Sequence, residues 1–235
     1  MINLIPMAGR GSRFIEKNYK TPKPFIPIVN EPMVLASLRS FPPADGYVFV
    51  CLQEHYDLLK SVTKNIKTHV EILVINAVTQ GQASTCLLAE KLLNSNEALF
   101  IASCDYQMIY DKQRYNELMK DDSIDVIIWT FKIGAIKKAN PKAFAYCKID
   151  KGRVAQVVEK QTISDTPNND SAVVGSFTYK NADLFLQSAK QMIEKNIRIN
   201  GEFYVATSIN QLIEQGYKVV SFEVEQFISF GDPFE

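Results

Sequence analysis

The sequence predicts an α/β fold, a three-layer α/β/α Rossmann-like sandwich in which a mostly parallel mixed sheet carries a small antiparallel lobe. Two observations favour this class. Short apolar runs recur through the first half of the chain, and each is separated from the next by a stretch long enough for a helix. In the second half, two strand-like runs flank a tight turn, which indicates antiparallel pairing. The 235 residues are expected to form one domain.

The parallel strands are expected where β-branched or aromatic residues form apolar runs of six to eight residues. Strands buried between two helical layers are typically apolar on both faces. In open parallel sheets, ligands bind beyond the carboxyl ends of the strands, so candidate site residues are expected there. The five runs cover residues 2–7, 46–52, 70–75, 98–103 and 124–131.

Two later segments are expected to form helices in different surroundings. Residues 82–94 carry apolar side chains nearly all round, as in a helix packed deep against a sheet. Residues 184–194 have one apolar stripe opposite a polar face, as in a surface helix.

The antiparallel lobe is expected from three strand-like segments. Residues 145–150 and 153–159 flank the sequence Asp-Lys-Gly, and residues 172–179 follow a polar loop. Their pairing would add an antiparallel region to the second half of the domain.

The charge balance and the cysteines limit the class of protein. The 26 basic and 26 acidic residues cancel, so no global field favours nucleic acid or an anionic membrane as a partner. The N-terminal apolar run is too short for a signal peptide or a membrane span. Cys51, Cys86, Cys104 and Cys147 are widely spaced, mostly within apolar runs, which predicts reduced core residues and a cytoplasmic protein.

A loop rich in glycine and basic residues follows the first strand. Residues 9–24 hold five cations and one acid. Gly9 and Gly11 let the backbone approach a phosphate closely, and Arg13 and Lys23 could neutralise its charge. A solvated basic loop whose glycines serve only a turn would explain the composition equally well. The loop lacks both a G-K-[ST] motif and the third glycine of G-x-G-x-x-G, which excludes a P-loop NTPase and a Rossmann dehydrogenase.

The same region carries a family signature. Residues 5–14 (IPMAGRGSRF), 22–28 (PKPFIPI) and 31–33 (EPM) together resemble the signature of the sugar-phosphate nucleotidyltransferases, also called nucleotide-sugar pyrophosphorylases. In that family, the loop backbone and its arginine hold the phosphates of an NTP, and the lysine contacts the α-phosphate region. The resemblance implies that the nucleotide is bound here by Met7, Ala8, Gly9, Arg10, Gly11, Ser12, Arg13 and Lys23.

A second polar loop precedes the first expected helix. In residues 79–85 (TQGQAST), side-chain amides and backbone groups could read the edge of a nucleobase, and Gly81 would permit close approach. A helix N-cap is the alternative. The segment resembles the base-binding segment of the family, which implies nucleotide-binding roles for Gln80, Gly81, Gln82 and Ser84.

A carboxylate ends the apolar run at residues 98–103. The charge of Asp105 at the end of a buried strand needs a partner, and Mg²⁺ accepts a few carboxylates together with phosphate oxygens and water. A structural aspartate that caps the next loop is the alternative. The segment resembles the metal-binding strand of the family, which implies Mg²⁺ as the cofactor, Asp105 as its ligand, and Ser103 beside the nucleotide.

The C-terminal segment departs from the family pattern W-x-D-x-G-T-P-E, which supplies a second metal ligand. Residues 227–233 read FISFGDP, so Ser229 stands where the carboxylate is expected. Asp232 follows three residues later. It either restores the lost charge as a metal ligand or caps a helix that Pro233 would begin.

Acceptor-binding residues are implied by three weaker likenesses. Glu159 and Lys160 resemble the E-K-P element of the family, although an exposed salt bridge would explain this pair equally well. Gly175 resembles the glycine of the acceptor strand. Residues 200–205 (NGEFYV), which include Glu202, resemble the region that covers the acceptor in a branch of the family found in capsule gene clusters.

The resemblance implies a single nucleotidyltransferase domain over residues 1–235, with Arg13, Lys23 and Asp105 as its catalytic residues. An oxygen of the acceptor phosphate attacks the α-phosphorus of an NTP and releases pyrophosphate. That nucleophile is already ionised at neutral pH, so no general base is required, and catalysis depends on positioning and charge neutralisation. The implied partners are CTP, UTP, dTTP or GTP and a phosphorylated acceptor, and a homo-oligomer remains open.

Three functions are compatible with these observations. The first is synthesis of a nucleotide sugar from a sugar 1-phosphate, for surface polysaccharide or capsule precursors. The second is a CTP-dependent cytidylyltransferase that acts on a phosphorylated amino acid or amide such as phosphoglutamine. The third is a nucleotide-binding sensor without catalysis, against which intact Arg13, Lys23 and Asp105 argue.

Overall fold

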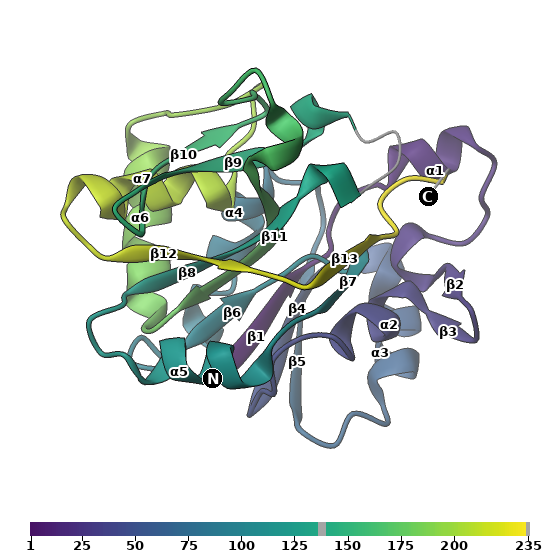
Figure 1. Cartoon of the computed structure of the whole chain (residues 1–235). Helices are drawn as coiled ribbons and strands as arrows, with labels where there is room; N and C mark the ends of the chain where they lie inside the picture. Colours follow the sequence, from purple (N-terminus) through teal and green to yellow (C-terminus); the bar gives the residue numbers. More distant parts are fainter. Residues whose placement is uncertain (136–139, 234–235) are drawn as a thin grey trace.

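The computed structural model describes residues 1–135 and 140–233, and its main sheet there has nine strands. Four of the five expected parallel strands lie side by side in the order β6-β1-β4-β5, with parallel pairing throughout (Figure 1). The fifth, β8, lies farther along the same sheet. These strands are β1 (Ile2–Pro6), β4 (Gly46–Leu52), β5 (His69–Ile75), β6 (Leu99–Ile101) and β8 (Val126–Lys132).

The expected antiparallel strands are also confirmed, and they extend this sheet. β11 pairs antiparallel with β6, β8 and β9, and β10 pairs antiparallel with β9 at the far edge. β12 runs parallel to β8. The small antiparallel region is therefore continuous with the parallel half. The bounds are β9 (Ala145–Asp150), β10 (Arg153–Glu159), β11 (Ser171–Tyr179) and β12 (Val219–Glu223).

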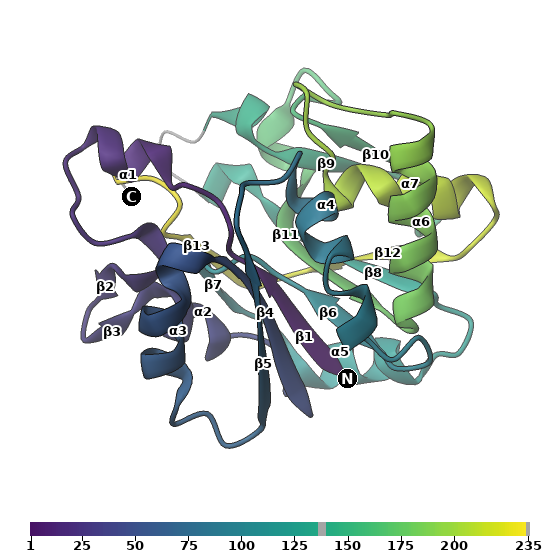
Figure 2. The same cartoon turned by 180° about the vertical axis from the view of Figure 1, so that it is seen from behind.

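Two helical layers cover the sheet, as expected for a three-layer sandwich. Successive residues of a strand point to opposite faces. Leu4 of β1 accordingly packs into a core that α4, α6 and α7 cover, whereas Ile5 packs into a second core that α2, α3 and α5 cover (Figure 2). The helices are α2 (Met33–Leu38), α3 (Tyr56–Thr63), α4 (Gln82–Leu87), α5 (Lys112–Lys120), α6 (Ala182–Glu194) and α7 (Val205–Glu214).

One of the two expected helices forms as predicted and the other is shorter. The stripe predicted over residues 184–194 is the buried face of α6. The helix predicted over residues 82–94 is wrong in length, because α4 ends at Leu87 and only a short 3₁₀ turn (Glu90–Leu92) follows. Its buried face carries small side chains such as Ala83 and Cys86, while Leu88, just past its end, is 52% exposed. Small residues allow the helix to lie close to β1 and α6.

Short elements gather at the carboxyl end of the parallel strands. β7 follows β6 along the chain and pairs antiparallel with β13. This pairing brings the C-terminal segment next to the end of β6. In Figures 1 and 2 the chain directly after β13 passes close to α1. These elements are α1 (Ser12–Glu16), β2 (Pro27–Ile28), β3 (Glu31–Pro32), β7 (Tyr106–Ile109) and β13 (Gln226–Ser229).

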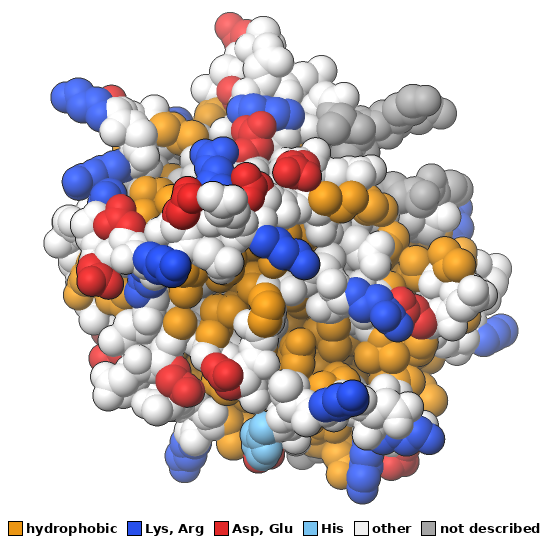
Figure 3. All heavy atoms as spheres, turned by 60° about the horizontal axis from the view of Figure 1, so that its bottom comes forward, with side chains coloured by type: hydrophobic (Ala, Val, Ile, Leu, Met, Phe, Trp, Pro, Cys, Tyr) orange, Lys and Arg blue, Asp and Glu red, His pale blue; other side chains and the backbone are white. Residues whose placement is uncertain are grey.

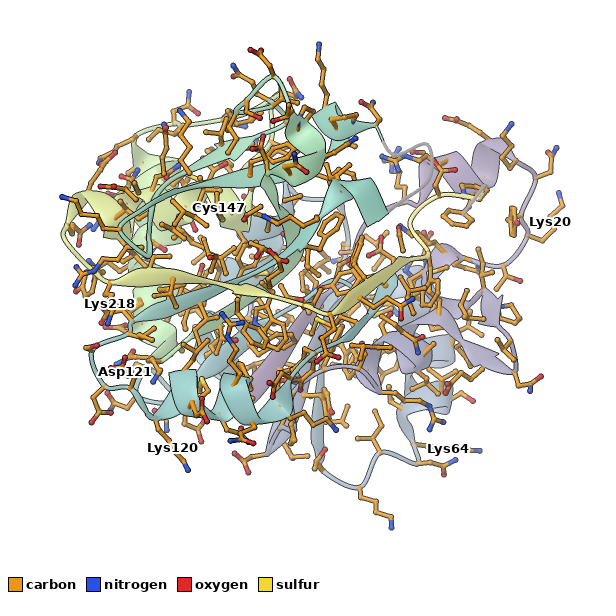
Figure 4. All side chains as sticks on the ribbon, in the orientation of Figure 1. Lys20, Lys64, Lys120, Asp121, Cys147 and Lys218 are labelled. Carbon is orange, nitrogen blue, oxygen red and sulfur yellow. The ribbon has the colours of Figure 1, made fainter. Side chains whose placement is uncertain are left out.

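The cysteines and the surface agree with the composition. All four cysteines are buried and free, including Cys147 on β9 (Figure 4). On the face drawn in Figure 3, basic and acidic side chains are interspersed and neither sign forms a continuous patch. Within the described residues, every helix is too short or too polar to cross a bilayer.

A buried histidine makes the stability depend on pH. His55 is 4% exposed, and its Nδ1 atom has no hydrogen-bond partner among the described residues. Burial lowers the pKa of His55, and nearby Glu54 opposes this only in part. The unfolded chain therefore binds a proton more readily, so the free energy of unfolding should fall as the pH drops below about 6.5.

We expect His55→Gln, which is neutral at every pH, to weaken this dependence. Urea unfolding of both proteins between about pH 7.5 and pH 5 measures it. The wild-type protein should lose stability more steeply on acidification than the variant. Parallel curves for the two proteins would contradict the assignment to His55.

Candidate active site

A cavity of about 830 Å³ lies where the chain leaves the carboxyl ends of β1 and β6. This is the position expected for a ligand of an open parallel sheet. The lining combines backbone of the glycine loop with charged and aromatic side chains from distant segments. It comprises Gly9, Gly11, Ser12, Arg13, Phe14, Lys23, Ser103, Asp105, Tyr106, Asn140, Ala143, Phe144, Val174, Glu202, Phe227, Ser229, Gly231 and Asp232.

The two loop glycines have different roles. Gly11 has a φ of +63°, and a Cβ atom there would lie 2.9 Å from Cβ of Lys23. The turn into α1 therefore requires glycine for its conformation and for the lysine beside it. A Cβ atom on Gly9 would meet no heavy atom within 4 Å. Gly9 instead keeps a stretch of backbone open to the cavity, as close approach by a phosphate would need.

Lys23 and Asp105 form the central ion pair of the cavity. Nζ of Lys23 lies 2.5 Å from Oδ2 of Asp105, and their side chains are 20% and 21% exposed. Burial alone would raise the pKa of Asp105, but the Lys23 ammonium and hydrogen bonds from Lys23 and Ser103 hold it below its usual range. Asp105 is therefore ionised at neutral pH, and the neighbouring Lys23 ammonium compensates its charge.

The C-terminal segment completes this side of the cavity. β13 places Ser229 opposite Tyr106, and the Phe230 amide donates to the Asp105 carbonyl oxygen at 2.8 Å. The Gly231 amide donates to Oγ of Ser229 at 3.2 Å. A Cβ atom on Gly231 would lie 3.5 Å from Oδ2 of Asp105 and 3.4 Å from Oγ of Ser229. The serine that replaces the expected carboxylate thus lies beside Asp105.

These oxygen donors fit a Mg²⁺ ion that is shared with a ligand. The described residues contain no group of three or more His, Cys, Asp or Glu side chains arranged for a metal. Mg²⁺ does not need such a cage, because it is commonly held by one or two carboxylates together with phosphate oxygens and water. Asp105 supplies one carboxylate, and Asp232 lines the same cavity. The Ser229 hydroxyl lies near Asp105.

The loop before α4 contacts the backbone next to Glu202, a lining residue, although no residue of the loop itself lines the cavity. Gly81 has a φ of +121°, and a Cβ atom there would lie 2.5 Å from the Phe203 carbonyl oxygen and 2.6 Å from its amide nitrogen. The missing side chain makes room for this backbone. Gly81 is the N-cap of α4, so the segment begins a helix as the alternative expected, but without a side-chain capping bond.

A second polar cluster lies beside the cavity. The Glu159 side chain is 6% exposed, and burial raises its pKa to about 7, with Lys160 opposing and Glu202 adding to this shift. Nζ of Lys160 lies 3.9 Å from Oε1 of Glu159 and donates to the Ala143 carbonyl oxygen. The Tyr204 hydroxyl donates to Oε2 of Glu202 at 2.5 Å. Glu202 thus links this cluster to the cavity that it lines.

The structure gathers about half of the predicted site residues. Gly175 is on β11 with a φ of +97°, and a Cβ atom there would lie 3.8 Å from the Tyr106 ring. Met7 and Ala8 are buried beneath the loop. The cavity brings together Gly9, Gly11, Ser12, Arg13, Lys23, Ser103, Asp105, Glu202 and Asp232. Outside its lining lie Met7, Ala8, Arg10, Gln80, Gly81, Gln82, Ser84, Glu159, Lys160 and Gly175.

Sequence reasoning missed the aromatic part of the lining. Tyr106, Phe144 and Phe227 come from three separate segments. Tyr106 directly follows Asp105, and Phe227 begins the C-terminal pattern compared above, whereas Phe144 carried no signal. The Tyr106 hydroxyl forms a hydrogen bond with the buried Ser176 hydroxyl, which holds the ring in place.

Comparisons with known proteins point in one direction. The family model described as nucleotidyl transferase matches residues 2–227. The bifunctional protein GlmU of Campylobacter fetus subsp. fetus (strain 82-40) is 24% identical over 240 residues, which cover 98% of this chain and 51% of that protein. The chain therefore spans about half the length of this curated relative.

Solved structures agree on the fold. A nucleoside-diphosphate-sugar pyrophosphorylase from Vibrio cholerae RC9 is similar with a TM-score of 0.81, 20% identity, and coverage of 100% of this chain and 97% of that one. The inositol-1-phosphate CTP transferase from T. maritima is similar with a TM-score of 0.78, 14% identity, and coverage of 99% and 90%.

Proposed function

The chain belongs to the nucleotidyl transferase family, and we propose that it transfers a nucleoside monophosphate from an NTP to a phosphorylated small molecule and releases pyrophosphate. The observation that carries this proposal is the ion pair of Lys23 and Asp105 beside the open backbone of Gly9. That arrangement offers donors and a cation for phosphates and a carboxylate for a metal in one cavity. The proposal treats residues 1–235 as one nucleotidyltransferase domain.

The reaction would need charge neutralisation more than proton transfer. An acceptor phosphate is ionised at neutral pH, so its oxygen can attack the α-phosphorus without a base. Arg13 and Lys23 would neutralise charge on the transferring group and on the departing pyrophosphate. Asp105, with Ser229 or Asp232, would hold Mg²⁺, which supplies further neutralisation of the phosphates when it is bound.

We place the acceptor next to Glu202. This side chain lines the cavity and connects to Glu159 and Lys160, which resemble the acceptor-binding element of the family. A sugar 1-phosphate is our first candidate, because the nucleoside-diphosphate-sugar pyrophosphorylase has a similar fold. A role in surface polysaccharide or capsule precursors rests on the likeness of residues 200–205 to one branch of the family. Four buried, free cysteines support a cytoplasmic location.

A CTP-dependent transfer to a different acceptor is our second candidate. The similar fold of an inositol-1-phosphate CTP transferase favours it, because its acceptor is not a sugar 1-phosphate. A phosphorylated amino acid or amide such as phosphoglutamine belongs to the same candidate.

Pyrophosphate release tests the proposal. The purified protein would be incubated with Mg²⁺, each of CTP, UTP, dTTP and GTP, and a panel of sugar 1-phosphates, inositol 1-phosphate and phosphoglutamine. Release that depends on both substrates, with formation of the matching nucleotide conjugate, would support transfer and identify both partners. NTP binding without release for any acceptor would favour the nucleotide sensor instead.

The Mg²⁺ dependence should reveal which group near the C-terminus assists Asp105. A serine hydroxyl is a weak substitute for a carboxylate ligand. We therefore expect Ser229→Asp to lower the Mg²⁺ concentration that gives the half-maximal rate, and Asp232→Asn to raise it. The rate would be measured across a Mg²⁺ titration at saturating NTP. An unchanged midpoint in both variants would mean that Asp105 affects the metal and that the C-terminal segment with Ser229 and Asp232 does not.

A further inference from the structure

The turn between α6 and α7 is tightly built. Ile199 and Glu202 exchange two backbone hydrogen bonds of 3.0 Å. Between them, Asn200 and Gly201 both have positive φ, at 51° and 82°, as in the two-residue turns that close hairpins. Glu202, which lines the cavity, therefore projects from a short hairpin and not from an irregular loop.

Arg198 fixes this hairpin with every nitrogen of its side chain. Its Nε atom donates to Oδ1 of Asn196 at 2.6 Å, and one terminal nitrogen donates to the Gly201 carbonyl oxygen at 3.2 Å. The other terminal nitrogen donates to Oε1 of Gln80 at 2.8 Å. The guanidinium carbon also lies 4.1 Å from the centre of the Phe203 ring. A planar fork that stacks on a ring is a geometry that arginine, but not lysine, can provide.

The backbone joins the same two segments. The Phe203 amide donates to the Gln80 carbonyl oxygen at 2.8 Å, and the Ala83 amide donates to the Phe203 carbonyl oxygen at 3.0 Å. Only glycine fits at position 81, because a Cβ atom would collide with the Phe203 backbone. The loop that begins α4 and the hairpin that carries Glu202 are thus held together by one side chain and two backbone bonds.

Arg198 also decides which way the Gln80 amide faces. An arginine has donors only, so the group of Gln80 that meets it must be the carbonyl oxygen. The Gln80 amide nitrogen is then directed away from Arg198, as a donor for a ligand. A nucleobase that presents a carbonyl oxygen matches such a donor.

We propose that Arg198 is a positioning residue that couples nucleotide binding at the loop of residues 79–82 to acceptor binding at Glu202. This inference rests on the proposed function, which places the acceptor at Glu202. The nucleotide is assigned to residues 79–82 because they resemble the base-binding segment of the family. With Arg198 in place, ordering of one loop by its substrate orders the other. Without it, only the two backbone hydrogen bonds join the loops, so the coupling between the two substrates should weaken.

The test uses Arg198→Met, which keeps a long side chain over the Phe203 ring but removes all three hydrogen bonds. We expect the KM of the NTP and the KM of the acceptor to rise together by about tenfold, with kcat changed much less. Arg198→Lys should recover little of the substrate affinity lost in Arg198→Met, because lysine lacks the planar guanidinium group. The effects of Gln80→Ala and Arg198→Met should be less than additive, because both act through the same contact.

Arg114→Met is the matched control. The Arg114 guanidinium also lies over a ring, 5.9 Å from the centre of Phe222, but on α5 and outside the cavity lining. This control should leave both KM values unchanged. Equal KM values for the wild type and Arg198→Met, or additive effects of the two substitutions, would overturn the proposal.

Hydrogen exchange separates this inference from the proposed function. Failure of the proposed function would appear as no pyrophosphate release by the wild-type protein with any NTP. The coupling is read independently in the substrate-free protein, where Arg198→Met should speed exchange at residues 79–83 and 199–203 together. Faster exchange in only one of the segments, or in neither, would overturn the coupling.

Discussion

Lys23→Met is expected to lower kcat/KM by at least about two orders of magnitude, because removal of one preorganised charge at a transition state costs about 2.7–4 kcal/mol. Among the described residues, Lys23 is the one lysine in the cavity lining, between the glycine loop and Asp105. Methionine retains most of the stem that packs against Gly11 and removes only the ammonium group. The loss should appear mainly in kcat, measured by pyrophosphate release at saturating substrates.

The same substitution should also destabilise the folded protein. It leaves the half-buried Asp105 carboxylate without the cation that lies 2.5 Å away, at a cost of about 1.5–3 kcal/mol. Mg²⁺ should restore part of this stability, since it can replace the missing charge.

Lys20→Met is the control for Lys23→Met. Lys20 lies in the same basic segment but projects at the outer edge of the molecule, outside the cavity lining (Figure 4). Its loss should leave the rate and the stability nearly unchanged. Similar rates for Lys20→Met and Lys23→Met would contradict the role given to Lys23.

The sequence was sufficient for the features that repeat or that lie close together along the chain. The parallel strands were predictable from their apolar runs, because both faces of such strands are buried, as Leu4 and Ile5 show by packing into two different cores. The position of Asp105 and the glycine loop at the same end of the sheet follows from parallel topology. These two rules predict that the glycine loop and Asp105 lie at one cavity, but not that Lys23 pairs with Asp105.

Features that depend on contacts between distant residues were out of reach. Lys23 and Asp105 are 82 positions apart, and Gln80 and Arg198 are 118 apart. Gly81 was interpreted as room for a nucleobase, yet the space beside it holds the Phe203 backbone. Apolar residues nearly all round residues 82–94 predicted a longer buried helix, because the pattern does not reveal that small side chains make the closest packing.

Asp105→Asn should be the most severe of the carboxylate substitutions, because an amide keeps the shape of the side chain but not the charge that attracts a metal ion. Metal assistance contributes several kcal/mol to transition-state stabilisation, so we expect at least about a hundredfold loss of turnover. The variant should also lose the steep gain in NTP affinity that Mg²⁺ gives the wild type. Calorimetric titration with NTP, with and without Mg²⁺, measures this difference.

The stability of the folded protein provides a second test of Asp105→Asn, because Asp105 forms an ion pair with Lys23. Because Lys23 and Asp105 form an ion pair of 2.5 Å, each single variant leaves one charge unpaired, whereas Lys23→Met combined with Asp105→Asn leaves none. The free energies of unfolding should therefore be non-additive, with the double variant more stable than the sum of the single losses predicts. Its turnover should nevertheless stay as low as that of Asp105→Asn. Equal NTP affinity and turnover of wild type and Asp105→Asn at every Mg²⁺ concentration would make Asp105 a structural partner of Lys23 and nothing more.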